Sequence, residues 1–325
     1  MTESSTPPPP VFMPPVLPRS TALDAASTSA PPPSQRPNQS KPKEEPIPST
    51  TFPLPKLRLE IRDLCHEGSD AFLKAVTADR ALAESVQSVL SLLYRSPDSQ
   101  TTTVPTTRSV TLILRPMEGV AYTTGSDLDN DHKEIHFSLD YIHCIAKERK
   151  KKEIMGVLTH EMVHCYQYDA FGTCSGGLIE GVADWVRLNA DLSPPHWKKD
   201  ANCKWDAGYQ HTAYFLEYLE QRFGKGTVMR LNEKLRIEKY HEKRFWKELI
   251  GRPVEKLWDD YKATLKKENE KAEEEECVIV EKEDVTTRNH PHRQKKSRSK
   301  SRSRSRNKSR SRSRSSREPM FEPGV

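Results

Sequence analysis

Two histidines and a glutamate in the stretch "HEMVHCYQYDAFGTCSGGLIEGVADW", residues 160–185, have the types and spacing of a metal-dependent hydrolase site. His160 and His164 are four residues apart, so on a helix both rings lie on one face and point at one ion. Glu161 lies one position further round the helix. From there its carboxylate reaches a water that the ion polarises without binding the ion itself, as a general base does in zinc hydrolases. The spacing therefore predicts a zinc site with His160 and His164 as ligands and Glu161 as the base.

A catalytic zinc ion needs a third protein ligand and one open position. We expect Glu180 to be that ligand, because it follows a glycine-rich reversal on the next predicted helix. Asp184 is one helical turn beyond Glu180. It can accept a hydrogen bond from the ring nitrogen of His160 that does not bind the metal, which fixes the tautomer. The alternative is a buried helix with two ordinarily hydrogen-bonded histidines. That alternative does not require two carboxylates four residues apart after a tight turn, so the sequence favours the metal site.

Two residues further along the chain are weaker candidates. Tyr209 and His211 lie near the start of a later predicted helix, where they could polarise the substrate carbonyl or stabilise its oxyanion. Aromatic side chains at helix starts are also common on protein surfaces, and that alternative stays open. Cys174 lies ten residues after His164 and is expected to be a free thiol beside a turn rather than a ligand.

The elements that must position these residues are strands followed mainly by helices. Alternating or continuous apolar residues predict strands at 57–61, 109–116 and 133–142. Helical spacing of apolar residues predicts helices at about 70–96, 153–169, 178–192, 208–224, 227–237 and 253–270. This order favours an α+β fold over alternating βαβ units. The strand at 133–142 is either an edge strand that pairs with an extended substrate or an ordinary strand of the sheet.

Composition divides the chain into four parts. Residues 1–55 hold most of the 25 prolines, interleaved with Ser and Thr, which predicts a disordered arm. Residues 56–268 form the folded domain, with enough apolar residues for a core. An acidic linker occupies 269–290, and a disordered, basic Arg-Ser tail occupies 291–325.

The tail carries the excess positive charge of the protein. Of the 52 Lys and Arg residues, 13 lie between His292 and Arg317, which contains no acid, so the rest has 39 basic and 46 acidic residues. Its repeats are similar to the RS domains of splicing-associated proteins. An unmodified polycation of this kind binds RNA or acidic partners by counterion release, and phosphorylation of its serines changes that charge. A purely solubilising or nuclear-import role is the alternative.

Other segments bear on partners and compartment. Val278–Val280, flanked by acids, resembles a SUMO-interacting motif, which adds a strand to its partner's sheet. The six cysteines have no framework spacing, and we expect free thiols. No signal peptide is visible in "MTESSTPPPPVFMPPVLPRS", and no apolar run is long enough to span a membrane. We therefore expect an intracellular, nuclear protein.

The motifs resemble those of the basic secretory protein family of plant and microbial peptidases. That family has the pattern H-E-x-x-H-x-x-Q followed by G-L-x-E-G-x-A-D-[WY]-V-R-L, and this chain has "HEMVHCYQ" and "GLIEGVADWVRL". The resemblance covers about Leu57 to Leu265. It implies a zincin-like fold, in which a twisted sheet packs on the active-site helix. It also implies His160, His164 and Glu180 as zinc ligands and Glu161 as the base. The basic tail is not part of the family pattern. The family is named for secretion, whereas no leader is visible in this sequence.

Two functions from different classes follow. The first is a zinc-dependent peptidase, an endopeptidase acting on proteins or peptides. The second is a catalytically idle zincin-like scaffold that the tail brings to ribonucleoprotein assemblies. The intact Glu161 favours the enzyme, because a scaffold can hold zinc without a general base.

Overall fold

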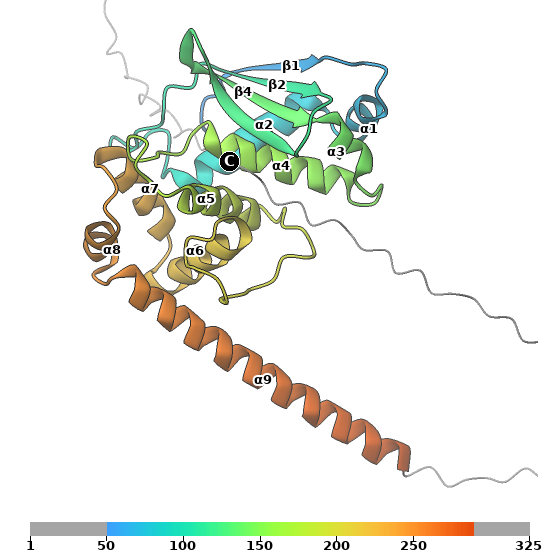
Figure 1. Ribbon diagram of the computed structural model, residues 1–325, viewed down its shortest axis with the longest axis vertical. Helices are drawn as coiled ribbons and strands as arrows, with labels where there is room; N and C mark the ends of the chain where they lie inside the picture. The colour runs from blue at the N-terminus through green and yellow to red at the C-terminus, as the bar shows by residue number, and fades with distance from the viewer. Residues whose placement is uncertain (1–50, 289–325) are drawn as a thin grey trace, which may run out of the picture. The chain divides into compact units, whose positions relative to one another are not determined.

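A computed structural model of the protein describes residues 51–288, with side chains as far as Lys271. Residues 1–50 of the predicted disordered arm, residues 289–290 of the predicted linker and the whole predicted Arg-Ser tail, residues 291–325, lie outside this part. The described residues form a mixed α/β domain with one small sheet and a series of helices (Figure 1).

The sheet has four strands in the order β1-β2-β4-β3. The strands are β1 (Lys56–Ile61), β2 (Ser109–Arg115), β3 (Ala121–Ser126) and β4 (Asp129–Ser138). β1 is parallel to β2 and β2 to β4, whereas β3 is antiparallel to β4. The strand expected at 133–142 is therefore not an edge strand, because β4 is paired on both sides. The edge strand next to it is β3, which the sequence analysis did not identify as a strand.

The strand expected at 133–142 also ends earlier than predicted. The Ser138 side chain accepts a hydrogen bond from the Tyr141 backbone N–H and caps a short helix, α3 (Leu139–Cys144). Serine is a preferred capping residue because its oxygen satisfies a free N–H of the first turn. The chain thus turns from β4 into α3.

Two helices join the parallel strands β1 and β2, where one long helix was predicted. They are α1 (Glu67–Ala75) and α2 (Ala78–Leu93). Val76 and Thr77 between them have extended backbone angles, in keeping with the lower helix propensity of β-branched residues. This β-α-α-β connection also means that helices are not confined to the C-terminal part of the chain.

Helix α4 (Lys150–His164) lies under the sheet, with α2 beside it and α5 (Gly176–Asn189) on its far side (Figure 1). Every residue from Ile154 to Val163 is buried. A helix enclosed on several sides is apolar around most of its circumference, and its remaining polar residues then need partners. α4 ends five residues before the predicted end at 169, and the following turn has left-handed backbone at Ala170 and Phe171.

The remaining helices form the C-terminal part of the domain. They are α6 (Tyr209–Phe223), α7 (Thr227–Ile237), α8 (Glu242–Ile250) and α9 (Val254–Arg288). Aromatic rings of Trp205, Phe215, Trp246 and Trp258 pack together between them. α8 was not predicted from the sequence.

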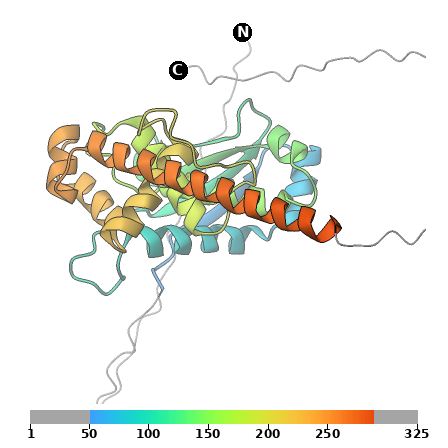
Figure 2. The ribbon, with the colours of Figure 1, turned by 90° about the horizontal axis from the view of Figure 1, so that it is seen from below.

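α9 is one continuous helix in both views (Figures 1 and 2). It runs as far as Arg288 through the segment assigned to the acidic linker, and Val278–Val280 lie within it. Pairing of these three residues with a partner's sheet would require α9 to unwind there. Among the described residues, no helix is both long enough and apolar enough to cross a membrane.

Candidate metal centre

Helices α4 and α5 meet along a row of polar side chains, which we call the polar seam. Its members are Glu153, His160 and His164 of α4 and Glu180, Asp184 and Arg187 of α5. The spacing of three, four or seven residues within each helix places each set on one face. His164 meets Glu180 at one end of the seam and Glu153 meets Arg187 at the other, so the two helices are antiparallel.

Three seam residues form a cluster with the spacing of metal ligands. His160 Nε2 lies 3.1 Å from Glu180 Oε2 and 3.3 Å from His164 Nε2, and His164 Nε2 lies 3.8 Å from Glu180 Oε1. One ligand atom from each residue lies within 4.8 Å of the others. Tetrahedral ligands on bonds of 2.0–2.1 Å are separated by about 3.3 Å. His160, His164 and Glu180 therefore fit a zinc ion by both chemistry and spacing.

The electrostatics of the cluster also suit a cation. Burial alone would lower the pKa of His160, but its hydrogen bonds with Asp184 and Glu180 raise that pKa to about 10. Burial and the neighbouring His160 lower the pKa of His164 to about 4. Two imidazoles and a carboxylate thus converge on one point, where a single positive charge is favoured.

Asp184 lies behind His160, on the side away from the cluster. His160 Nδ1 lies 2.7 Å from Asp184 Oδ1, and the Asp184 side chain is buried. When Nδ1–H donates to this carboxylate, the lone pair of Nε2 is directed into the cluster. Asp184 therefore has the position that was expected from the sequence.

Glu161 is buried beside the cluster and contacts the edge strand of the sheet. Its Oε2 lies 2.7 Å from the hydroxyl of Thr123 on β3, which is also 3.0 Å from the Glu161 carbonyl oxygen. Burial raises the pKa of Glu161 above its ordinary value, which is suitable for a group that takes up and returns a proton. Thr123 was not expected from the sequence, because this contact depends on the packing of β3 against α4.

Tyr209 reaches the site and His211 does not. The Tyr209 ring is almost parallel to the His160 ring, with 6.1 Å between their centroids, and about half of its surface is exposed. Gly208, with φ of 87°, turns the chain into α6 just before it. A backbone conformation of this kind is one that glycine adopts readily. No hydrogen bond, ion pair or ring contact joins His211 to the cluster in the described part of the chain.

The end of the polar seam far from the histidines is an ion pair that was not expected from the sequence. Arg187 lies 2.8 Å from Glu153 Oε1, and the hydroxyl of Tyr141 donates to the same oxygen. Gly156 gives the guanidinium room, since a Cβ atom there would lie only 2.6 Å from Arg187 Nε. The pair joins α4 to α5 about two helical turns from the histidines and fixes their register.

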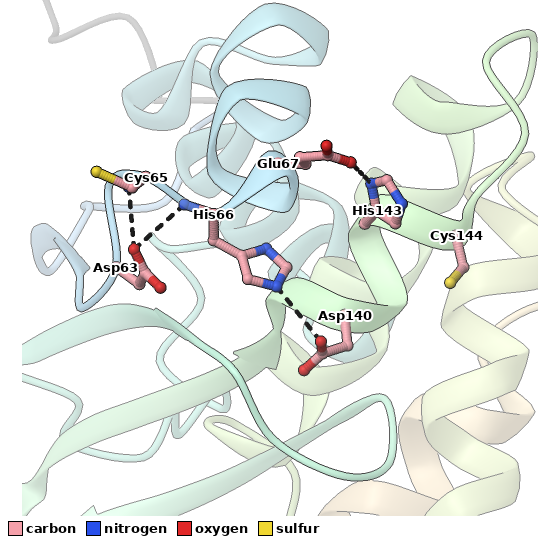
Figure 3. Close-up of a pocket in the computed structure, with 7 residues that line it drawn as sticks. All are labelled: Asp63, Cys65, His66, Glu67, Asp140, His143 and Cys144. Atoms are coloured by element: carbon pink, nitrogen blue, oxygen red, sulfur yellow. Dashed lines mark hydrogen bonds and ion pairs between the residues drawn. The ribbon is translucent and has the colours of Figure 1, made fainter.

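A second group of possible ligands lines a pocket of about 500 Å³ at α1 and α3 (Figure 3). The lining residues are Asp63, Cys65, His66, Glu67, Asp140, His143 and Cys144. His66 Nδ1 accepts the Gly68 N–H at the start of α1, so the ring proton is on Nε2, 3.3 Å from Asp140 Oδ1. No lone pair of His66 remains for a metal. His143 pairs with Glu67 over 3.1 Å, and we interpret these contacts as the junction that joins α1 to α3.

Comparison with known proteins gave one match. A family model described as "BSP: Peptidase of plants and bacteria" matches residues 54–261. No curated protein and no solved structure matched the chain.

Proposed function

The chain belongs to the BSP family of peptidases of plants and bacteria, and from this membership we propose that it is a zinc-dependent endopeptidase with a zincin-like fold. The observation that carries the proposal is the convergence of His160, His164 and Glu180, with Glu161 beside them. The packing of the sheet on α4, with a ligand from the following helix, supports the zincin-like assignment.

The ligand set explains why the site suits hydrolysis rather than a structural role. Three protein ligands leave one position of a tetrahedral ion open, whereas structural zinc sites use four. When bound, a zinc ion in such a site supplies a Lewis acid that polarises the peptide carbonyl and makes water more acidic.

The residues of the chain carry the proton transfers. Glu161 accepts a proton from the attacking water and then passes it to the amine of the leaving peptide. The Thr123 hydroxyl, 2.7 Å from Glu161 Oε2, holds this carboxylate in place. Asp184 keeps the His160 ring in one orientation through Nδ1.

Two further features suit a peptide substrate. In the described residues β3 pairs only with β4, so an extended peptide can add to its other edge. Because Thr123 of β3 touches Glu161, that edge brings a peptide close to the base. Tyr209, half exposed beside His160, is placed to donate its phenolic proton to a developing oxyanion.

The Arg-Ser composition of residues 292–317 supports a proposal about location. We propose that this polycation directs the protein to the nucleus and to RNA or RS-domain partners. A scaffold without catalysis is the alternative function for such a chain, and the buried, Thr123-bonded Glu161 favours the enzyme.

Metal analysis of purified protein tests the proposal. We expect close to one zinc ion per chain and its loss in His160→Ala, His164→Ala and Glu180→Ala. His211→Ala serves as the matched control and should retain zinc. Full zinc occupancy in Glu180→Ala would show that another residue is the third ligand.

A further inference from the structure

The side chain of Gln167 lies against His164 on the side away from the cluster. Gln167 Nε2 is 2.8 Å from His164 Nδ1, and the other end of the same amide, Oε1, is buried with no hydrogen-bond partner in the described part of the chain. Buried polar atoms in folded proteins are nearly always paired, so this arrangement needs an explanation.

The turn after α4 fixes the position of this side chain. The backbone N–H groups of Tyr166 and Gln167 both donate to the Val163 carbonyl, over 2.8 and 2.7 Å. This tight turn brings residue 167 back beside residue 164. Gln167 therefore lies next to Nδ1 of His164, just as Asp184 lies next to Nδ1 of His160. Gln167 follows the end of α4 itself, whereas Asp184 comes from α5.

The chemistry of a metal-binding histidine decides how the amide must be oriented. A ring that binds an ion through Nε2 carries its proton on Nδ1, and that proton needs an acceptor. An amide N–H cannot accept it. Rotating the Gln167 amide by half a turn exchanges its oxygen and nitrogen, which are nearly isosteric. Oε1 then accepts the Nδ1 proton, while Nε2 moves to the buried position that Oε1 held.

We propose that Gln167 is a positioning residue for the metal, whose Oε1 accepts the Nδ1 proton of His164 when zinc is held. This inference rests on the proposed function. The Nδ1 protons of the two histidines then have different acceptors, a carboxylate for His160 and a neutral amide for His164. Glu161, Glu180 and Asp184 already place three carboxylates around the ion. A fourth would bind the cation more tightly but make it less able to polarise a carbonyl.

The test compares zinc affinity, measured by competition with a chelator, among three variants of the full chain. Gln167→Met keeps the length of the side chain and removes the acceptor, so zinc should bind about 10–100-fold more weakly. Gln167→Glu keeps an acceptor and should bind zinc at least as tightly as wild type while cleaving peptides more slowly. Gln221→Met is the control, since the side chain of that glutamine on α6 donates a hydrogen bond to Glu217, and its zinc affinity should equal that of wild type.

Two outcomes would overturn the positioning role of Gln167, and a third would remove the proposed function. Wild-type affinity in Gln167→Met would overturn the positioning role. So would equal weakening in Gln167→Met and Gln167→Glu, because the amide would then act as a donor or only as a filler of space. A wild-type protein that bound no zinc would instead remove the proposed function, and this inference with it.

Discussion

Asp184 accepts a hydrogen bond from His160 across the interface between α5 and α4, over 2.7 Å, while Glu180 one turn earlier faces the other nitrogen of the same ring. A single helix thus presents one carboxylate to Nε2 of His160, within the cluster, and another to Nδ1 of the same ring. The four-residue spacing within α5 makes this possible, because both side chains lie on one face. Both nitrogens of the ring therefore have a carboxylate partner.

Replacing Asp184 by Asn is expected to weaken zinc binding without abolishing it. The amide oxygen can still accept from Nδ1 but lacks the negative charge that strengthens His160 as a ligand, so we expect a loss of about 10–100-fold in affinity. Chelator competition on the purified variant measures the loss. Asp191→Asn is the matched control, because that carboxylate is almost fully exposed near the end of α5. Unchanged zinc affinity in Asp184→Asn would show that the charge of Asp184 does not contribute to metal binding.

The Glu153–Arg187 pair predicts a dependence of stability on pH. Burial alone would raise the pKa of Glu153, but Arg187, Tyr141 and Arg149 together lower it by more, and the net pKa is below the ordinary value of 4.5. The charged carboxylate therefore stabilises the fold at neutral pH. That contribution disappears as the pH falls through the pKa of the folded state, below 4.5.

Glu153→Gln should accordingly lower the free energy of unfolding at neutral pH by about 1–3 kcal/mol. The difference in the free energy of unfolding between the variant and wild type should shrink in acid, below the ordinary pKa of a glutamate. Denaturant unfolding in the presence of a chelator checks this without interference from metal release. Glu148→Gln, at an exposed position on the approach to α4, is the control. An equal loss of unfolding free energy at neutral pH and in acid would mean that the charge of Glu153 does not stabilise the fold.

The sequence could predict the parts of the site that depend on local spacing. His160, Glu161 and His164 share one helix, and Glu180 and Asp184 share the next, so periodicity alone placed them on common faces. Thr123, Arg187 and Gln167 could not be assigned roles in this way. Their contacts depend on the register of β3 against α4, of α5 against α4, and on the tight turn after His164.

The fold was predictable to a similar degree. Apolar patterns indicated most helices, but the break at Val76 and Thr77 interrupts an otherwise helical pattern and was missed. The strand order β1-β2-β4-β3 is not the order of the chain. An edge strand is defined by its missing neighbour, which no local pattern records, and the sequence therefore left open whether residues 133–142 form an edge strand.

The Arg-Ser tail is expected to determine where in the cell the protein is located. Removing residues 292–325 should abolish nuclear enrichment and salt-sensitive RNA binding, because the remainder of the chain has more acidic than basic residues. Cleavage of an unstructured substrate should not change. Imaging of tagged full-length and truncated chains measures nuclear enrichment, and RNA-binding and peptidase assays on the same two chains measure the other two properties. A tail with Lys in place of Arg keeps the charge and serves as the control. Full-length protein found in the medium with paired cysteines would contradict the proposed location.

The most direct measurement of the central claim is the zinc content and casein cleavage of Glu161→Gln beside wild type. The amide retains an oxygen for Thr123 but cannot take up a proton, so the fold and the ligand cluster remain and only proton transfer is removed. We predict close to one zinc ion per chain in both proteins and a loss of at least about 10²–10⁴-fold in cleavage by the variant. Equal cleavage by the two proteins at equal zinc content would contradict the peptidase mechanism.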